Sequence, residues 1–242
     1  MIELVLAATA TAFATGLGAV PVAMLGDRAE ALRPALLGLA AGVMAVASVA
    51  GLLLPALDDG SPGEVALGLV LGLAFLLAAR LWLTHHEREH PLRSRSLRTS
   101  LLVFTVLLVH SLPEGFAIGT AYASETAGLG LFVVIAIAVQ NIPEGTSVAI
   151  PLEAAGYGGW RQFWAAVATS APQPVGAVIA YLLVEQVSAL LAVSFGFAAG
   201  AMLALVAVEL APEAWRADPR RAVLGTLVGA AAMLGLSLAL GV

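Results

Sequence analysis

Long apolar runs alternate with short polar breaks along the whole of this sequence. Each run holds roughly 20 residues, which is enough for a helix to cross a hydrocarbon core about 30 Å thick. Turn residues and charges separate the runs, which we expect to be transmembrane helices near residues 4–25, 34–57, 65–83, 100–122, 128–152, 159–184, 187–210 and 223–240. The pattern predicts an all-α integral membrane protein with eight spans and a single transmembrane domain over residues 1–242.

The arginines test this arrangement and give it an orientation. The chain has no lysine and 11 arginines, all in or beside the odd-numbered loops of the eight-span arrangement. They are Arg28, Arg33, Arg80, Arg88, Arg93, Arg95, Arg98, Arg161, Arg216, Arg220 and Arg221. Since cytoplasmic loops carry an excess of Arg and Lys, we predict that both termini lie outside.

The composition agrees with a membrane protein and removes other classes. The 242 residues are 60% hydrophobic and 11% charged, with a mean hydropathy of +0.98, whereas soluble domains are about half apolar and a quarter charged. The net charge of -5 comes without a basic patch for nucleic acid, and without cysteine there is no thiolate metal site. The first residues lack the basic start of a cleavable signal peptide, so we expect the first run to be retained.

Two similar motifs lie deep within the fourth and fifth runs. The first, His-Ser-Leu-Pro-Glu-Gly, begins at His110, and the second, Gln-Asn-Ile-Pro-Glu-Gly, begins at Gln140. Because residues four apart share one helix face, His110 lies with Glu114 and Gln140 lies with Glu144. An ionised carboxylate in the middle of a bilayer is costly, so two such acids in one setting indicate a functional site.

Together the motifs offer ligands for a divalent cation. Two carboxylates neutralise its charge, the imidazole of His110 favours transition metals over magnesium or calcium, and Gln140 offers a carbonyl oxygen. Pro113 and Pro143 each free a backbone carbonyl that can face the cation or a water. Two alternatives remain: Pro-Glu-Gly as a helix end facing water, and His110 as a lone histidine bonded to a neighbouring helix.

Another internal similarity links the second and seventh runs. Ala-Ala-Gly-Val-Met, ending at Met44, is similar to Ala-Ala-Gly-Ala-Met, ending at Met202, and a proline follows each, Pro55 or Pro212. The two runs cross in opposite directions, as an inverted-topology repeat requires, and secondary transporters often bind substrate between such repeats. The alternative is that Ala-Ala-Gly is simply common in tightly packed membrane helices.

On these motifs the chain resembles the ZIP family of divalent-metal transporters, whose fourth span typically reads His-Asn-x-Pro-Glu-Gly and whose fifth reads Gln-Asn- or Gln-Asp-x-Pro-Glu-Gly. The resemblance implies a three-two-three arrangement of spans with inverted repeats, in a multi-pass protein of the bacterial inner membrane. It also implies that zinc, or Fe²⁺, Cd²⁺, Co²⁺, Ni²⁺ or Mn²⁺, moves toward the cytoplasm as a substrate, with no cofactor and no ATP hydrolysis. Whether the chain acts as a homodimer is left open.

The resemblance also assigns residues. The primary metal site falls on His110, Glu114, Gln140 and Glu144, with Met44 as a soft neighbour. A second, adjoining site in many members maps onto Ser111, Asn141 and Gln173, which lack the negative charge usual there. We therefore expect a single ion, or a second site too weak to fill.

Three further groups are candidates along the path of the ion, although solvated side chains are the alternative for each. They are Asp58 and Asp59 at the outer mouth, Glu209 and Glu213 near the inner exit, and His85, His86 and His90 in a cytoplasmic loop of residues 84–99. The arginines near the histidines oppose cation binding there.

Other functions compete with transport. A metal receptor or scaffold uses the same ligands and differs only in ion flux, and a channel differs in whether flux saturates at low metal concentration. An intramembrane metallohydrolase is disfavoured, because His-Glu-x-x-His is absent. Ser111 also projects about 100° away from His110 around the helix, which makes a poor nucleophile and base pair. We predict a transporter and not an enzyme.

Overall fold

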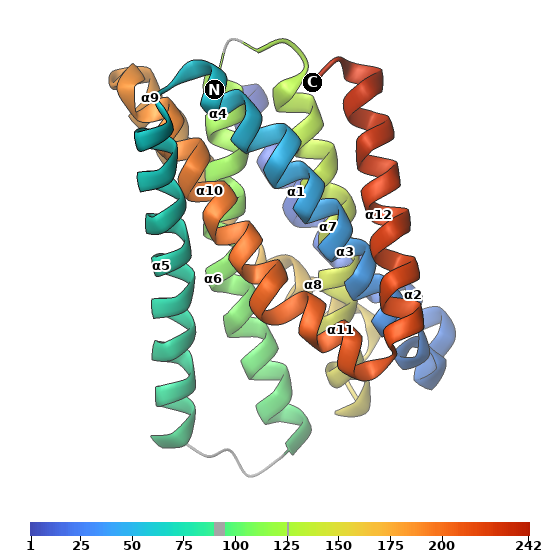
Figure 1. The fold of residues 1–242 in the computed structure, drawn as a ribbon. Helices are drawn as coiled ribbons and strands as arrows, with labels where there is room; N and C mark the ends of the chain where they lie inside the picture. The colour runs from blue at the N-terminus through green and yellow to red at the C-terminus, as the bar shows by residue number, and fades with distance from the viewer. Residues whose placement is uncertain (90–94, 125) are drawn as a thin grey trace.

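The computed structural model describes residues 1–89, 95–124 and 126–242, and every regular element within them is a helix. Eight helical segments are long and apolar enough to cross a membrane: Ile2–Leu25, Arg28–Asp59, Pro62–Trp82, Phe104–Ala123, Leu129–Ala154, Gly159–Gln186, Ser188–Ala217 and Pro219–Leu240. Each coincides with one predicted run, so the prediction of eight spans is confirmed. Figure 1 shows them as one bundle with both chain termini at the same end.

Half of the spans are single helices and half are interrupted. The single helices are α5 (Pro62–Glu89), α6 (Arg95–Ala123), α7 (Leu129–Ala154) and α12 (Pro219–Leu240). The first span joins α1 (Ile2–Leu17) to α2 (Ala19–Leu25), and the sixth joins α8 (Gly159–Thr169) to α9 (Pro172–Gln186). The second contains η1 (Gly26–Leu32), α3 (Arg33–Ser48), η2 (Val49–Leu53) and α4 (Leu54–Asp59). The seventh contains η3 (Ser188–Leu190), α10 (Leu191–Leu205), η4 (Val206–Leu210) and α11 (Ala211–Ala217).

A short π-helical segment precedes a proline in both the second and the seventh span. These segments are η2, before Pro55, and η4, before Pro212. In η4 the backbone N–H of Ala211 donates to the carbonyl of Val206, five residues back. A proline cannot donate to the carbonyl four residues back, and its ring crowds that carbonyl, so a wider turn relieves the crowding. The π segments therefore follow from the positions of the prolines.

The helices pair closely through small residues. α3 packs against α12, and α5 packs against α10. A Cβ atom at Gly42 of α3 would overlap the carbonyl oxygen of Thr226, and one at Gly72 of α5 would overlap that of Phe197. The remaining main pairs are α6 with α9 and α1 with α7. Exchanging the second span with the seventh and the third with the eighth turns the pair of α3 and α12 into the pair of α10 and α5. The pairing supports the inverted repeat, which stays a prediction, as does the three-two-three arrangement.

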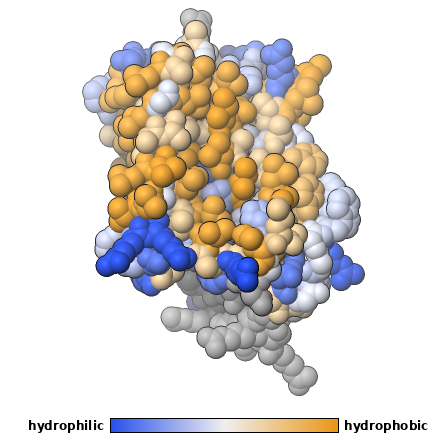
Figure 2. All heavy atoms as spheres, turned by 90° about the vertical axis from the view of Figure 1, so that its right-hand side faces the viewer, coloured by the Kyte–Doolittle hydropathy of each residue, from blue (hydrophilic) through white to orange (hydrophobic). Residues whose placement is uncertain are grey.

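The outer surface of the bundle suits a lipid environment. Figure 2 shows a broad hydrophobic band with hydrophilic side chains gathered beyond its lower edge. Beyond its first turn, α12 exposes large apolar side chains, as at Leu224 and Leu238. At one end, Arg221 donates to the carbonyl of Ala31, which joins the start of α12 to η1. This end lies opposite the termini in Figure 1; which side of the membrane it faces stays a prediction.

The predicted loop of residues 84–99 lies between the third and fourth spans, but most of its backbone is helical, and its cytoplasmic position stays a prediction. α5 continues to Glu89 and α6 begins at Arg95, so only residues 90–94 fall between the two helices, outside the described residues. The sequence holds no glycine or proline from Thr84 to His90, and its Glu and Arg residues are good helix formers. Polarity alone therefore did not mark the end of the helix.

Candidate metal site

Glu114 of α6 is the centre of a buried polar cluster. Its side chain is 1% exposed, and both carboxylate oxygens accept hydrogen bonds from side-chain amides. Nε2 of Gln140, on α7, donates to Oε1 at 2.8 Å, and Nε2 of Gln173, in the first turn of α9, donates to Oε2 at 2.6 Å. The structure therefore brings together Glu114 and Gln140, as the twin motifs predict, and adds Gln173 directly to them.

Glu144 lies one helical turn beyond Gln140 on α7. Its side chain is 3% exposed, and its Oε1 has no hydrogen-bond partner. Glu114 and Glu144 lie on α6 and α7, which pack against each other. Both acids of the twin motifs are thus buried inside the bundle, and neither opens onto an aqueous surface.

His110 and Met44 line a narrow cavity beside Glu114. The other residues around this cavity are Leu76, Pro113, Ala201, Met202 and Leu205. His110 is 5% exposed and its Nδ1 has no hydrogen-bond partner, while its Nε2 lies 3.8 Å from Oε2 of Glu209. The predicted soft neighbour, Met44, therefore shares a cavity with two of the predicted ligands.

The positions that correspond to a second site hold neutral side chains bonded to protein groups. Nδ2 of Asn141 donates to the backbone carbonyl of Thr11 at 2.8 Å and to Oε1 of Gln173 at 3.3 Å. Oγ1 of Thr11 also donates to Oε1 of Gln173, at 3.0 Å. Ser111 instead donates to the backbone carbonyl of Thr169 at 2.8 Å. Sequence reasoning missed Thr11, whose only signal is a hydroxyl within an apolar run.

The predicted ligands do not form a preorganised metal site. Among the residues that the structure describes, no three His, Asp or Glu side chains are arranged to hold a metal ion. The physical reason is that two amides occupy the oxygens of Glu114, while the imidazole of His110 faces Glu209. Binding of a cation would require these side chains to reorient.

A second polar group lies where η4 meets α5. Nη1 of Arg80 donates to the carbonyl of Val208 at 3.3 Å. Pro212, four residues further on, cannot supply a backbone donor to this carbonyl. Sequence reasoning counted Arg80 only for topology, although an arginine so close to an apolar run was the signal for this contact.

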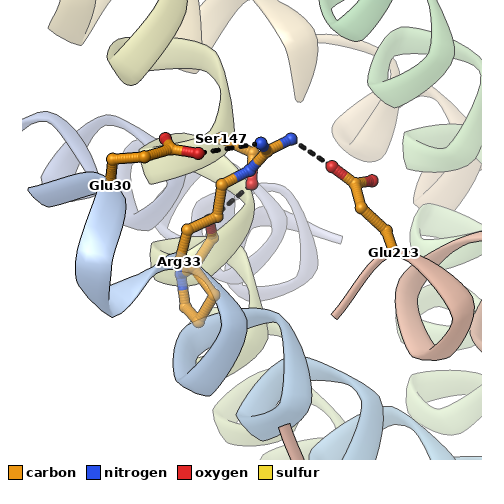
Figure 3. Close-up of polar contacts among 5 residues, drawn as sticks. Glu30, Arg33, Ser147 and Glu213 are labelled. Atoms are coloured by element: carbon orange, nitrogen blue, oxygen red, sulfur yellow. Dashed lines mark hydrogen bonds and ion pairs between the residues drawn. The ribbon is translucent and has the colours of Figure 1, made fainter. Parts of the chain in front are cut away.

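Glu213, predicted to receive the released ion, is paired with an arginine. Figure 3 shows Arg33, the first residue of α3, between Glu213 of α11 and Glu30 of η1. Nη1 of Arg33 lies 3.3 Å from Oε1 of Glu30, and Nη2 forms the ion pair with Glu213. The carboxylate of Glu213 can meet a cation only if this ion pair opens.

The remaining candidates lie away from the buried cluster. Asp58 and Asp59 are exposed at the end of α4, and Asp59 lines an open pocket with Ala123 and Ser188. His85 is exposed on α5, whereas the side chain of His86 and the whole of His90 lie outside the described residues. The structure therefore keeps the aspartates at the opposite end of the second span from Arg33, and leaves the histidine cluster untested.

Comparison with known proteins gives a consistent result. A family model described as ZIP Zinc transporter matches residues 60–237. The zinc transporter ZIPB of Bordetella bronchiseptica is 38% identical over 94% of this chain and 78% of its own length. The zinc transporter GufA of Myxococcus xanthus is 34% identical over 94% of this chain and 95% of its own length. A protein of Arabidopsis thaliana, provisionally named a zinc transporter, is also 34% identical, but this chain spans only 37% of its length.

Proposed function

The chain belongs to the ZIP zinc transporter family and is a multi-pass transporter of divalent metal ions, and we propose that it binds zinc between α6 and α7. The ligands in this proposal are His110, Glu114, Gln140 and Glu144, with Met44 as a soft neighbour. Zinc is the substrate here and not a cofactor, and the bacterial relatives agree with a place in the inner membrane.

Three buried atoms without partners carry the proposal. Nδ1 of His110, Oε1 of Gln140 and Oε1 of Glu144 each lack a hydrogen bond. Buried polar groups normally have a partner, and leaving one unsatisfied costs about 1–3 kcal/mol. Imidazole nitrogen and carboxylate oxygen are the usual non-thiolate ligands of zinc. A cation held among these atoms would supply the interaction that each of them lacks.

The charge of the site suits a single divalent ion. Glu114 and Glu144 together carry two negative charges, which match one Zn²⁺. Asn141 and Gln173 add no charge, and the amide nitrogens of both already donate to protein groups, although Oδ1 of Asn141 has no hydrogen-bond partner. We therefore infer that one ion is bound, and that any second ion binds much more weakly.

The route through the protein is also part of the proposal. Asp58 and Asp59 attract the cation at the outer mouth, and Glu209 receives it from His110 on the way to the arginine-rich end. Transport toward the cytoplasm then requires the buried site to open to each side in turn, as expected for a site between inverted repeats. Glu213 takes part only after its ion pair with Arg33 opens.

The proposal is tested by zinc flux into proteoliposomes loaded with a zinc-sensitive dye. Glu144→Gln should abolish uptake, since it removes a charged ligand while keeping the shape of the side chain. Glu185→Gln is the matched control, because Glu185 is exposed at the far end of α9, and it should transport normally. Undiminished flux in Glu144→Gln would remove the assigned role. Zinc binding without flux in the wild type would instead indicate a receptor, and flux that does not saturate would indicate a channel.

A further inference from the structure

We propose that Gln173 is a positioning residue that sets the metal preference of the site. It holds Oε2 of Glu114, so that this carboxylate binds the ion through Oε1 alone. The inference rests on the proposed metal role of Glu114 and extends it to the mode of binding and the choice of metal.

The hydrogen bonds around Gln173 fix the orientation of its amide. The backbone carbonyl of Thr11 can only accept, so the atom of Asn141 that lies 2.8 Å from it is the amide nitrogen. The same nitrogen lies 3.3 Å from the side-chain amide of Gln173. Because a nitrogen donates here, the Gln173 atom that accepts is its oxygen. The hydroxyl of Thr11 contacts that oxygen as well, at 3.0 Å. The amide nitrogen of Gln173 must therefore face Glu114, whose ionised carboxylate only accepts.

Gln140 is held much less firmly than Gln173. Its nitrogen donates to Oε1 of Glu114 at 2.8 Å, but its own oxygen has no partner. No hydrogen bond at the oxygen of the amide has to break for a rotation that turns the Gln140 oxygen toward a cation. An arriving ion therefore displaces Gln140 from Oε1 of Glu114, while Gln173 keeps its bond to Oε2.

Binding through one carboxylate oxygen favours some metals over others. Zinc is commonly four-coordinate and is satisfied by single oxygen or nitrogen atoms from each ligand. Manganese prefers six oxygen ligands in an octahedral arrangement, and a bidentate carboxylate helps to reach that number. By keeping Oε2 away from the ion, Gln173 lowers the number of oxygens that the site offers and so disfavours manganese relative to zinc.

The test compares Mn²⁺ and Zn²⁺ binding by calorimetry on the full-length protein in detergent. Gln173→Met keeps a side chain of similar length but removes the amide, which frees Oε2 of Glu114. We expect the affinity for Mn²⁺ to rise relative to that for Zn²⁺ by about tenfold, the lower end of the effect of an outer-shell partner on metal affinity. A purely structural role for Gln173 would change both affinities by the same factor, and that result would overturn the inference.

A second variant keeps the test valid if Gln173→Met folds poorly. Thr11→Val removes the hydroxyl whose single hydrogen is shared between the Gln173 oxygen at 3.0 Å and the carbonyl of Ala8 at 2.8 Å. It should shift the preference in the same direction by a smaller factor. Thr120→Val is its matched control, because the buried hydroxyl of Thr120, on α6, has no partner, and it should leave the preference unchanged. An unchanged preference in both Gln173→Met and Thr11→Val overturns the inference alone. Undiminished zinc binding by Glu114→Gln overturns the proposed site as well.

Discussion

Nε2 of His110 lies 3.8 Å from Oε2 of Glu209, which connects the fourth span to the π-helical segment of the seventh. His110 shares a cavity with Glu114, while the side chain of Glu209 is 25% exposed. The imidazole thus borders both the buried carboxylate and an acid that reaches toward solvent. A cation that leaves Glu114 can pass to Glu209 without crossing a purely apolar surface.

Glu209→Gln should therefore slow zinc release more than it weakens zinc binding. The variant removes the charge that draws the ion away from His110 but leaves the four proposed ligands in place. We expect the maximal uptake rate in proteoliposomes to fall several-fold, and equilibrium affinity to fall less than in His110→Gln, where we expect a loss of about 10–100-fold. Stopped-flow dye measurements and calorimetry give the two quantities. Wild-type rates in Glu209→Gln would contradict this route.

Acid should weaken zinc binding. In the proposed site the metal binds the deprotonated carboxylates and the neutral imidazole, so protons should compete with it and binding should release them. Affinity should be highest at the alkaline end of a series between about pH 5 and pH 8 and should fall toward the acidic end. Calorimetry in buffers of different ionisation enthalpy counts the protons released. Glu144→Gln removes one competing group and should give a shallower pH dependence, and an affinity that does not vary with pH would contradict the ligand set.

Reversing the charge of Arg33 should destabilise the arginine-rich end, and reversing Glu213 as well should restore part of the loss. The side chains are 27% and 41% exposed, so solvent screens the pair and its worth is about 0.2–1 kcal/mol. Arg33→Glu places a third acid beside Glu30 and Glu213 and should lower the thermal midpoint in detergent. The double variant, Arg33→Glu with Glu213→Arg, should regain part of it. Strictly additive losses in this cycle would show that the pair is not coupled.

Gly42→Ala should destabilise the protein although alanine is the better helix former. A methyl group there would overlap the carbonyl of Thr226 on α12, and overpacking of this kind typically costs about 1–3 kcal/mol. Gly235→Ala is the matched control, because no atom lies within 4 Å of the added carbon, and it should be neutral or stabilising by up to about 1 kcal/mol. Thermal unfolding of the two variants in detergent checks the difference. Equal midpoints would show that α3 and α12 can separate at no cost.

The spans and the centre of the site were predictable from the sequence, for physical reasons. A membrane span must be apolar over about 20 residues, so the eight apolar runs can be recognised as spans from the sequence alone. The acids at Glu114 and Glu144 stand out because so few charges occur inside the runs.

Details that depend on packing between distant segments were not predictable. The contact of Arg80 with Val208 needs α5 and η4 to lie side by side, and the role of Thr11 needs α1 to meet α9. The π segments of the second and seventh spans also went unforeseen, since a proline in a helix can equally produce a kink. Likewise, the helical backbone at both ends of residues 84–99 went unforeseen, because polar residues are compatible with a helix and with an irregular loop.

The π segment η4 contains Glu209 and holds one residue more per turn than the α-helix on either side. If that extra residue were expelled and the segment rewound as α-helix, everything beyond it would rotate by about 100° about the helix axis. Such a rewinding would swing the carboxylate of Glu209 out of reach of His110 while α10, which precedes the segment, kept its place. The wide turn before Pro212 thus lets this helix change its rotation at the residue that receives the ion in the proposed route.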